Sequence, residues 1–210
     1  MADRSSVDFM PAQASDNVAA VRVTEPSTVV IFGATGDLTA RKLIPAFVRL
    51  AAQGLLPGVF SIVGVARRTL TDLVFRESLK QTVDKHLSRA AAGRNADVWD
   101  ALAPGVHYCP LRFDQPADYR RLTEFLERIE TERGAPGQRL FYLATAPEFF
   151  QPIVENLSAA GLIRGPGDRC PSRVIIEKPF GHDLESALAL NRGTGRVLDE
   201  DQIYRIDHYL

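Results

Sequence analysis

The stretch Thr28–Thr39, with the sequence TVVIFGATGDLT, decides the fold of this 210-residue chain. Its first part is β-branched and aromatic, which is typical of a strand covered on both faces of a sheet. Gly33 and Gly36 then predict a turn, and a helical pattern follows over Ala40–Ala52. A strand, a glycine-bearing turn and a helix N-terminus can bind a pyrophosphate, because unpaired N–H groups and the positive end of the helix dipole point at the ligand.

The same alternation of strand and helix recurs along the rest of the chain. Short apolar runs predict six strands, and amphipathic segments with apolar residues three and four apart lie between them. This pattern is typical of βα units, so we predict an α/β fold with a doubly wound, mostly parallel sheet of the Rossmann type. The predicted strands are Thr28–Phe32, Phe60–Val65, Val106–Cys109, Arg139–Leu143, Arg173–Ile176 and Gln202–Ile206.

Composition and charge limit the classes of function. With 25 basic and 26 acidic side chains the net charge is −1, so no long-range field attracts nucleic acid or an anionic membrane. No apolar run approaches the ~18 residues that span a bilayer. Cys109 and Cys170 show no metal-ligand spacing, so we predict no metal site and a reducing, cytoplasmic setting. Residues 1–27 carry no targeting pattern and are predicted to be a disordered leader to a domain over residues 28–210.

The turn after the first predicted strand departs from two common phosphate-binding patterns. Gly33 permits a tight turn and Gly36 lets phosphate oxygens approach the backbone, but Thr39 stands where the usual fingerprint has a third glycine. No Gly-Lys-Ser/Thr follows, which excludes a Walker motif. Taken alone, the turn fits an ordinary βα connection as well as a cofactor site.

Two arginines, Arg67 and Arg68, follow the second predicted strand. An acidic residue there would accept hydrogen bonds from the ribose 2′-hydroxyl of NAD, whereas arginine suits the 2′-phosphate of NADP. No acid is present at this strand end, so the sequence favours NADP. The alternative is that both arginines are solvated loop residues, which is the commoner situation of such a pair.

Glu177 and Lys178 follow the fifth predicted strand, and Pro179 comes next. In doubly wound sheets the ligand lies beyond the carboxyl ends of the strands, so this lysine is a candidate site residue. The proline disfavours helix at Lys178 and would direct its ammonium group towards the crevice. The alternative is a surface ion pair between Glu177 and Lys178 before a helix stop.

An acid, an imidazole and a phenol follow the sixth predicted strand at Asp207, His208 and Tyr209. Neighbours on a strand point to opposite faces, so Asp207 and His208 are not expected to form a base with its orienting partner. Removing a hydride from an alcohol carbon needs a base for the hydroxyl proton, and a histidine oriented by a carboxylate serves best near neutral pH. The other histidines, His86, His107 and His182, are predicted to be packing or surface residues, so we expect the base beyond Leu210.

These segments resemble the glucose-6-phosphate dehydrogenase family, in that family's order and at its spacing, from about Thr28 to the last residue. The resemblance implies NADP-dependent oxidation of D-glucose 6-phosphate to 6-phosphogluconolactone, the first step of the oxidative pentose phosphate pathway. The matching motifs are VIFGATGDLTARKLIPAF at Val30–Phe47, VGVARR at Val63–Arg68, FYLATAP at Phe141–Pro147, IEKPFG at Ile176–Gly181 and YRIDHYL at Tyr204–Leu210.

The resemblance also implies roles for single residues. Asp207 would orient the catalytic histidine, which in the family comes from a second domain, through which members also form homo-oligomers. The residues implied to bind the substrate are Lys178, His208 and Tyr209. Those implied to bind NADP are Gly33, Ala34, Thr35, Gly36, Asp37, Leu38, Arg67 and Lys178.

We therefore expect an N-terminal NADP-binding domain that is inactive alone; the alternative is a non-catalytic NADP-binding module. Another oxidoreductase or epimerase on this fold would need a Tyr-xxx-Lys pair, and Tyr142 with Ala146 and Tyr204 with His208 both fail that spacing. One departure from the family pattern lies after the third strand, where Arg112 stands close to the expected adenine site and could favour a 2′-phosphate instead.

Overall fold

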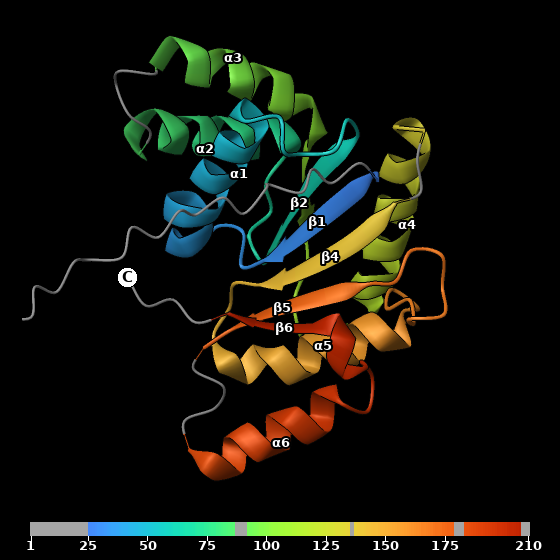
Figure 1. The fold of residues 1–210 in the computed structure, drawn as a ribbon. Coiled ribbons are helices and arrows are strands. Elements are labelled where there is room, and N and C mark those ends of the chain that lie inside the picture. Colours follow the sequence, from blue (N-terminus) through green and yellow to red (C-terminus); the bar gives the residue numbers. More distant parts are fainter. Residues whose placement is uncertain (1–24, 87–91, 135–136, 179–182, 207–210) are drawn as a thin grey trace, which may run out of the picture.

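The computed structural model describes residues 25–86, 92–134, 137–178 and 183–206, which form a parallel sheet between two layers of helices (Figure 1). The six strands lie in the order β3-β2-β1-β4-β5-β6, and all five neighbouring pairs are parallel. This order is that of a doubly wound sheet, with its topological switch point between β1 and β4. The predicted fold class is confirmed. The strands are β1 Ser27–Phe32, β2 Phe60–Ala66, β3 Val106–Pro110, β4 Gln138–Leu143, β5 Arg173–Glu177 and β6 Ile203–Ile206.

Each observed strand agrees with its predicted range to within one residue at either end. The one residue predicted as strand that lies outside is Gln202, which ends a short 3₁₀ turn at Glu200–Gln202. Its buried side-chain amide donates to the carbonyl oxygens of Arg164 and Ser172, both at 2.8 Å. The side chain thus ties the start of β6 to the connection before β5, which a pattern of apolar residues does not reveal.

Two hydrophobic cores lie on opposite faces of the sheet, because successive strand residues alternate between the faces. Val30 and Phe32 of β1 pack towards α4 and α5, whereas Val29 and Ile31 pack towards α1, α2 and α3. Figure 1 shows the same division, with α6 lying outside α5. The helices are α1 Ile44–Ala52, α2 Asp72–His86, α3 Ala92–Leu102, α4 Pro116–Glu132, α5 Phe150–Ala159 and α6 Leu184–Thr194.

The helix predicted over Ala40–Ala52 is present, but its beginning is wider than an α-helix. Thr39–Leu43 form a π-type turn, and the regular helix α1 follows it. Pro45 has no N–H to donate to the carbonyl of Arg41, so the regular ladder is interrupted at this point. No helix in the described part of the chain has both the length and the apolar character needed to cross a membrane.

A buried ion-pair network joins helix and sheet near the amino ends of the strands. Arg139 of β4 makes a two-pronged contact with Glu130 of α4, at 2.7 and 3.0 Å. Arg164 reaches the same carboxylate at 3.4 Å and donates to the carbonyl of Gly137 at 3.0 Å. Buried charges need this kind of pairing, because an uncompensated charge in the interior is costly.

We predict that Arg139→Met lowers the free energy of unfolding by about 3 kcal/mol, because it leaves the Glu130 carboxylate buried with one weaker partner. The side chains of Arg139 and Glu130 are only 3% and 6% exposed. The measurement is urea unfolding of both proteins. The matched control is Arg128→Met, which breaks a 3.9 Å pair with Glu132 in which both side chains are over 60% exposed. Its expected cost is below about 1 kcal/mol, and equal losses in the two variants would contradict the prediction.

Candidate cofactor site

The turn that follows β1 lies at the carboxyl edge of the sheet, beside the switch point. The N–H groups of Gly33 and Ala34 both donate to the carbonyl of Val65 in β2, at 2.9 and 3.2 Å. The N–H of Gly36 donates back to the carbonyl of Gly33 at 2.9 Å. These bonds fix the turn to the neighbouring strand, so its shape is set before any ligand arrives.

Gly33 is required at this turn for two reasons. Its φ of +84° lies in the left-handed region, which residues other than glycine rarely adopt. A Cβ atom there would also lie 2.1 Å from the carbonyl oxygen of Ala144, which follows β4. The N–H of Ala144 in turn donates to the carbonyl of Phe32 at 3.0 Å. The chain therefore passes too close to the end of β4 for any side chain at this position.

Thr39 occupies the place of the third glycine and contributes a bond that the sequence analysis missed. Its side chain is fully buried, and its hydroxyl donates to the carbonyl of Gly33 at 3.4 Å. Between these two residues, Thr35, Gly36 and Asp37 are exposed. The first N–H groups of a helix have no acceptor within it, so a helix start can offer donors to a phosphate, although in this turn the N–H of Gly36 is already bonded to Gly33.

The residues that follow β2 and β3 lie at the same edge of the sheet as this turn. Arg67 and Arg68 are exposed, as a phosphate-binding role requires. Arg112 is engaged elsewhere, because its N–H and its Nε both contact Oδ2 of Asp118, at 2.9 and 3.3 Å. Burial alone would raise the pKa of Asp118, but the hydrogen bonds from Arg112 and the charge of Arg121 outweigh it and lower that pKa. The structure thus favours Arg67 and Arg68 over Arg112 as partners of a 2′-phosphate.

Lys178 follows β5 and is exposed at the same edge of the sheet. Its backbone N–H donates to the carbonyl of Ile206 at 3.0 Å, so its position is fixed against β6. The preceding Glu177 accepts a hydrogen bond of 2.5 Å from the hydroxyl of Tyr142, a partner the sequence analysis missed. Burial and this hydrogen bond raise the pKa of Tyr142, so the hydroxyl stays protonated. The available signal was the strand register, since Tyr142 lies opposite Ile175 and therefore on the same face as Glu177.

Three predicted site residues, Asp207, His208 and Tyr209, lie outside the described residues. The two histidines within the described ranges lie away from the carboxyl edge. His86 is exposed at the end of α2, and His107 is the second residue of β3. Burial lowers the pKa of His107, although its Nδ1 lies 3.1 Å from Asp72. Among the described residues, no group of histidine, cysteine and acidic side chains could hold a metal ion.

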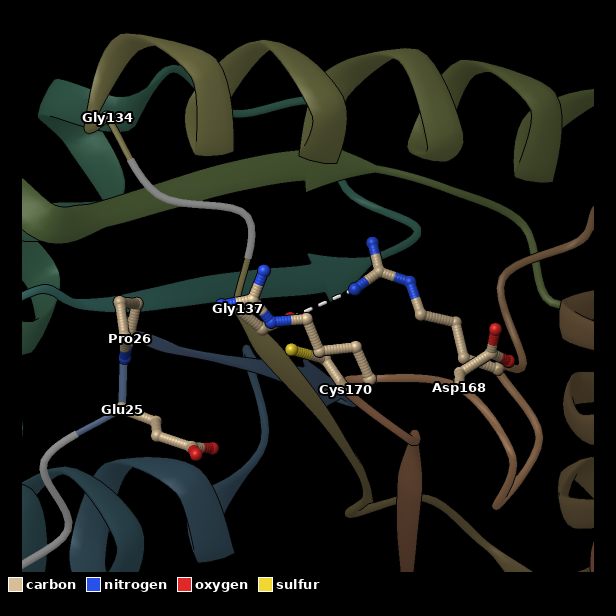
Figure 2. A pocket seen from close by; sticks show the side chains of 8 residues that line it. Glu25, Pro26, Gly134, Gly137, Asp168 and Cys170 are labelled. Carbon is tan, nitrogen blue, oxygen red and sulfur yellow. Dashed lines mark hydrogen bonds between the residues drawn. The ribbon is translucent and has the colours of Figure 1, made fainter.

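A cavity of about 590 Å³ lies at the opposite, amino edge of the sheet (Figure 2). It is lined by the residues that precede β1, β4 and β5, among them Pro26, Gly137 and Cys170. In doubly wound sheets ligands bind outside the carboxyl ends of the strands, so this cavity is at the wrong edge for a dinucleotide. The Arg164 side chain beside it is already bonded to Gly137 and Glu130.

We predict that Gly33→Ala destabilises the protein more than Gly54→Ala does. Both glycines have positive φ, +84° and +68°, but a Cβ at Gly54 meets nothing within 4 Å. The Gly54 variant therefore carries only the conformational cost, about 1–2 kcal/mol, and the Gly33 variant adds a collision with backbone. Urea unfolding measures both. Similar losses at the two positions would show that Ala144 moves aside and that the close approach does not constrain the turn.

Comparisons with known proteins agree with this geometry. The family model described as "Glucose-6-phosphate dehydrogenase, NAD binding domain" matches residues 30–210. A relative named glucose-6-phosphate 1-dehydrogenase 2, from Mycobacterium tuberculosis, is 44% identical over 189 residues, which cover 90% of this chain and 36% of that protein. The glucose-6-phosphate 1-dehydrogenase of Bacillus subtilis is 43% identical over 184 residues, which cover 88% of this chain and 35% of that protein.

Solved structures give the same result. A glucose-6-phosphate dehydrogenase in complex with its substrate glucose-6-phosphate superposes with a TM-score of 0.78 at 33% identity, covering 90% of this chain and 38% of that one. The enzyme from Mycobacterium avium superposes with a TM-score of 0.68 at 35% identity, covering 86% of this chain and 36% of that one. The chain thus spans a little over a third of the length of the proteins it matches. Over residues 30–210, the chain belongs to the glucose-6-phosphate dehydrogenase family and matches its NAD-binding domain.

Proposed function

We propose that this chain is the NADP-binding part of a glucose-6-phosphate 1-dehydrogenase, which oxidises D-glucose 6-phosphate to 6-phosphogluconolactone. The observation that carries the choice of cofactor is the end of β2, where Arg67 and Arg68 are exposed and no acid stands. A 2′-phosphate needs cations there, whereas the 2′-hydroxyl of NAD needs an acceptor. The cytoplasm as location and assembly with further copies remain predictions of the sequence analysis.

In this proposal each part of the carboxyl edge has one task. The exposed turn from Thr35 to Asp37 binds the pyrophosphate through backbone N–H groups, and its glycine lets the phosphate approach closely. Arg67 contacts the 2′-phosphate. Lys178 lies between cofactor and substrate, and its cation attracts the phosphorylated sugar. When bound, NADP supplies the acceptor for the hydride that leaves C1 of the sugar.

The remaining tasks fall to residues outside the described ranges. His208 and Tyr209 bind the substrate phosphate in this proposal, and Asp207 orients the histidine that takes the proton from the C1 hydroxyl. His86 and His107 do not serve as that base, because they lie away from the carboxyl edge and His107 is engaged with Asp72. The family resemblance supports a base supplied from a second domain, as this proposal requires.

We predict that Arg67→Ala weakens NADP binding by about tenfold or more and leaves NAD binding unchanged. A hydrogen bond to a charged group contributes about 1.5–3 kcal/mol, and only NADP carries the phosphate that loses it. Calorimetric titration of the purified chain with each dinucleotide measures this. Arg49→Ala, which removes an exposed arginine from α1, is the control. An equal loss for NAD and NADP in the Arg67 variant would refute the assigned role.

We also predict that the 210-residue chain binds NADP but forms no NADPH with glucose 6-phosphate. A positioned base contributes about 10²–10⁴ in rate, and no histidine in the described ranges stands where one is needed. The measurement is absorbance of NADPH beside the titration. Turnover that disappears in His208→Gln would place the base within this chain and overturn the division of roles. Binding without turnover also fits the alternative of a non-catalytic module, against which the family membership counts.

A further inference from the structure

The loop that carries Arg67 and Arg68 is held from beneath by a buried tyrosine of β3. The hydroxyl of Tyr108 lies 2.6 Å from the carbonyl oxygen of Arg68 and 3.3 Å from that of Ala66. The Tyr108 side chain is 3% exposed, and its ring packs against Phe75 with 4.9 Å between centroids. The hydroxyl has one proton, and the shorter distance directs it to Arg68, so this bond fixes the backbone directly after Arg67.

The other end of the same loop is fixed to the same part of β3. Asp72, the first residue of α2, accepts the N–H of Tyr108 on Oδ1 at 2.8 Å. Its Oδ2 lies 3.1 Å from Nδ1 of His107. Residues 67–71 are thus held between two anchors on β3, one made by the hydroxyl of Tyr108 and one by its backbone.

This arrangement suits a loop whose side chains must meet a phosphate. The side chains of Arg67 and Arg68 are exposed and long, and ordering such side chains on binding costs conformational entropy. A fixed backbone lowers that cost, because the arginines begin each encounter from one position. Burial raises the pKa of Tyr108 to about 12, so the hydroxyl keeps its proton at neutral pH.

The second anchor also engages an acid that would otherwise compete with the phosphate. Asp72 is the first acid after the arginine pair, and a free carboxylate there would repel a 2′-phosphate or attract the arginines. Its two oxygens are instead directed to β3, and Arg76 lies 3.6 Å from Oδ2. The loop therefore presents its positive charge without a nearby free acid.

We propose that Tyr108 is a positioning residue for cofactor selection: by holding the carbonyl of Arg68, it places the arginine pair where the 2′-phosphate of NADP binds. This inference rests on the proposed function, since it presupposes that the arginines meet that phosphate. Loss of the hydroxyl should therefore weaken the discrimination between a 2′-phosphate and a 2′-hydroxyl. It should leave the binding of the rest of the nucleotide unchanged.

The test uses the full 210-residue chain, Tyr108→Phe and two small probes, 2′,5′-ADP and 5′-AMP, which differ only in the 2′-phosphate. Calorimetry gives the ratio used in the test, which is the dissociation constant of 5′-AMP divided by that of 2′,5′-ADP. We expect this ratio to fall about fivefold in Tyr108→Phe, because the arginine loop must then be ordered on binding, with 5′-AMP binding unchanged. An unchanged ratio, or an equal loss of affinity for both probes, would overturn the proposal.

Two further variants keep the test decisive. Thr194→Val removes another buried hydroxyl, which donates to the carbonyl of Leu190 at 2.9 Å in α6, and it should leave the ratio unaltered. If Tyr108→Phe does not fold, Asp72→Ala, which removes the second anchor, is compared with Asp72→Asn, which removes the same charge but keeps an oxygen that can accept the N–H of Tyr108. The ratio is expected to be lower in Asp72→Ala than in Asp72→Asn, and equal ratios in these two variants would overturn the proposal.

The unmodified chain separates this inference from the proposed function. If it binds 2′,5′-ADP no better than 5′-AMP, the proposed NADP preference is wrong and the role of Tyr108 falls with it. If it prefers 2′,5′-ADP and Arg67→Ala removes the preference while Tyr108→Phe keeps it, only the inference about Tyr108 is wrong. Both results come from binding alone and need no turnover.

Discussion

The close approach of Gly33 to the carbonyl of Ala144 is the constraint on which the carboxyl edge of this sheet depends. β1 lies between β2 and β4, and the connections from these strands leave towards opposite faces. The chain leaving β1 must turn away at once without colliding with the chain leaving β4, and only a glycine in the left-handed region achieves this. Because Val65 accepts both N–H groups at this turn, the same constraint also aligns the turn with the end of β2.

The helix after this turn begins where the turn places it, and it also stabilises the turn. The hydroxyl of Thr39 closes the loop back onto Gly33, which ties the helix start to the strand end. A third glycine would allow close packing of helix and strand, whereas a buried threonine gives a direct bond in its place. The wide turn over Thr39–Leu43 accompanies Pro45, so the local irregularity has a covalent cause and lies next to the candidate site.

The sequence predicted the strands well, but it did not predict the side-chain hydrogen bonds that join one strand to another or to a loop. Strands covered on both faces are continuous apolar runs, which is why each boundary agrees to within a residue. The bonds from Tyr142 to Glu177 and from Tyr108 to Arg68 join residues 35 and 40 positions apart. They depend on which strands become neighbours and on the shape of the loop after β2, which apolar patterning within each strand does not encode. Of the predicted site, the structure describes the turn after β1, Arg67 and Lys178. Asp207, His208 and Tyr209 lie outside the described residues.

Stability and binding draw on different edges of the sheet. The ion pairs of Glu130 with Arg139 and Arg164 lie near the amino ends, where one carboxylate is paired with two guanidinium groups and the charges are mostly buried. At the carboxyl edge Arg67, Arg68 and Lys178 are exposed. With a net charge of −1 the chain has no overall field to attract a polyanionic dinucleotide, so in the proposed function the cations at this edge and the helix N-terminus supply the attraction. Such an attraction is short in range and screened by salt, so selectivity in that proposal depends on where each cation is held, and the bonds beneath the arginine loop contribute to recognition.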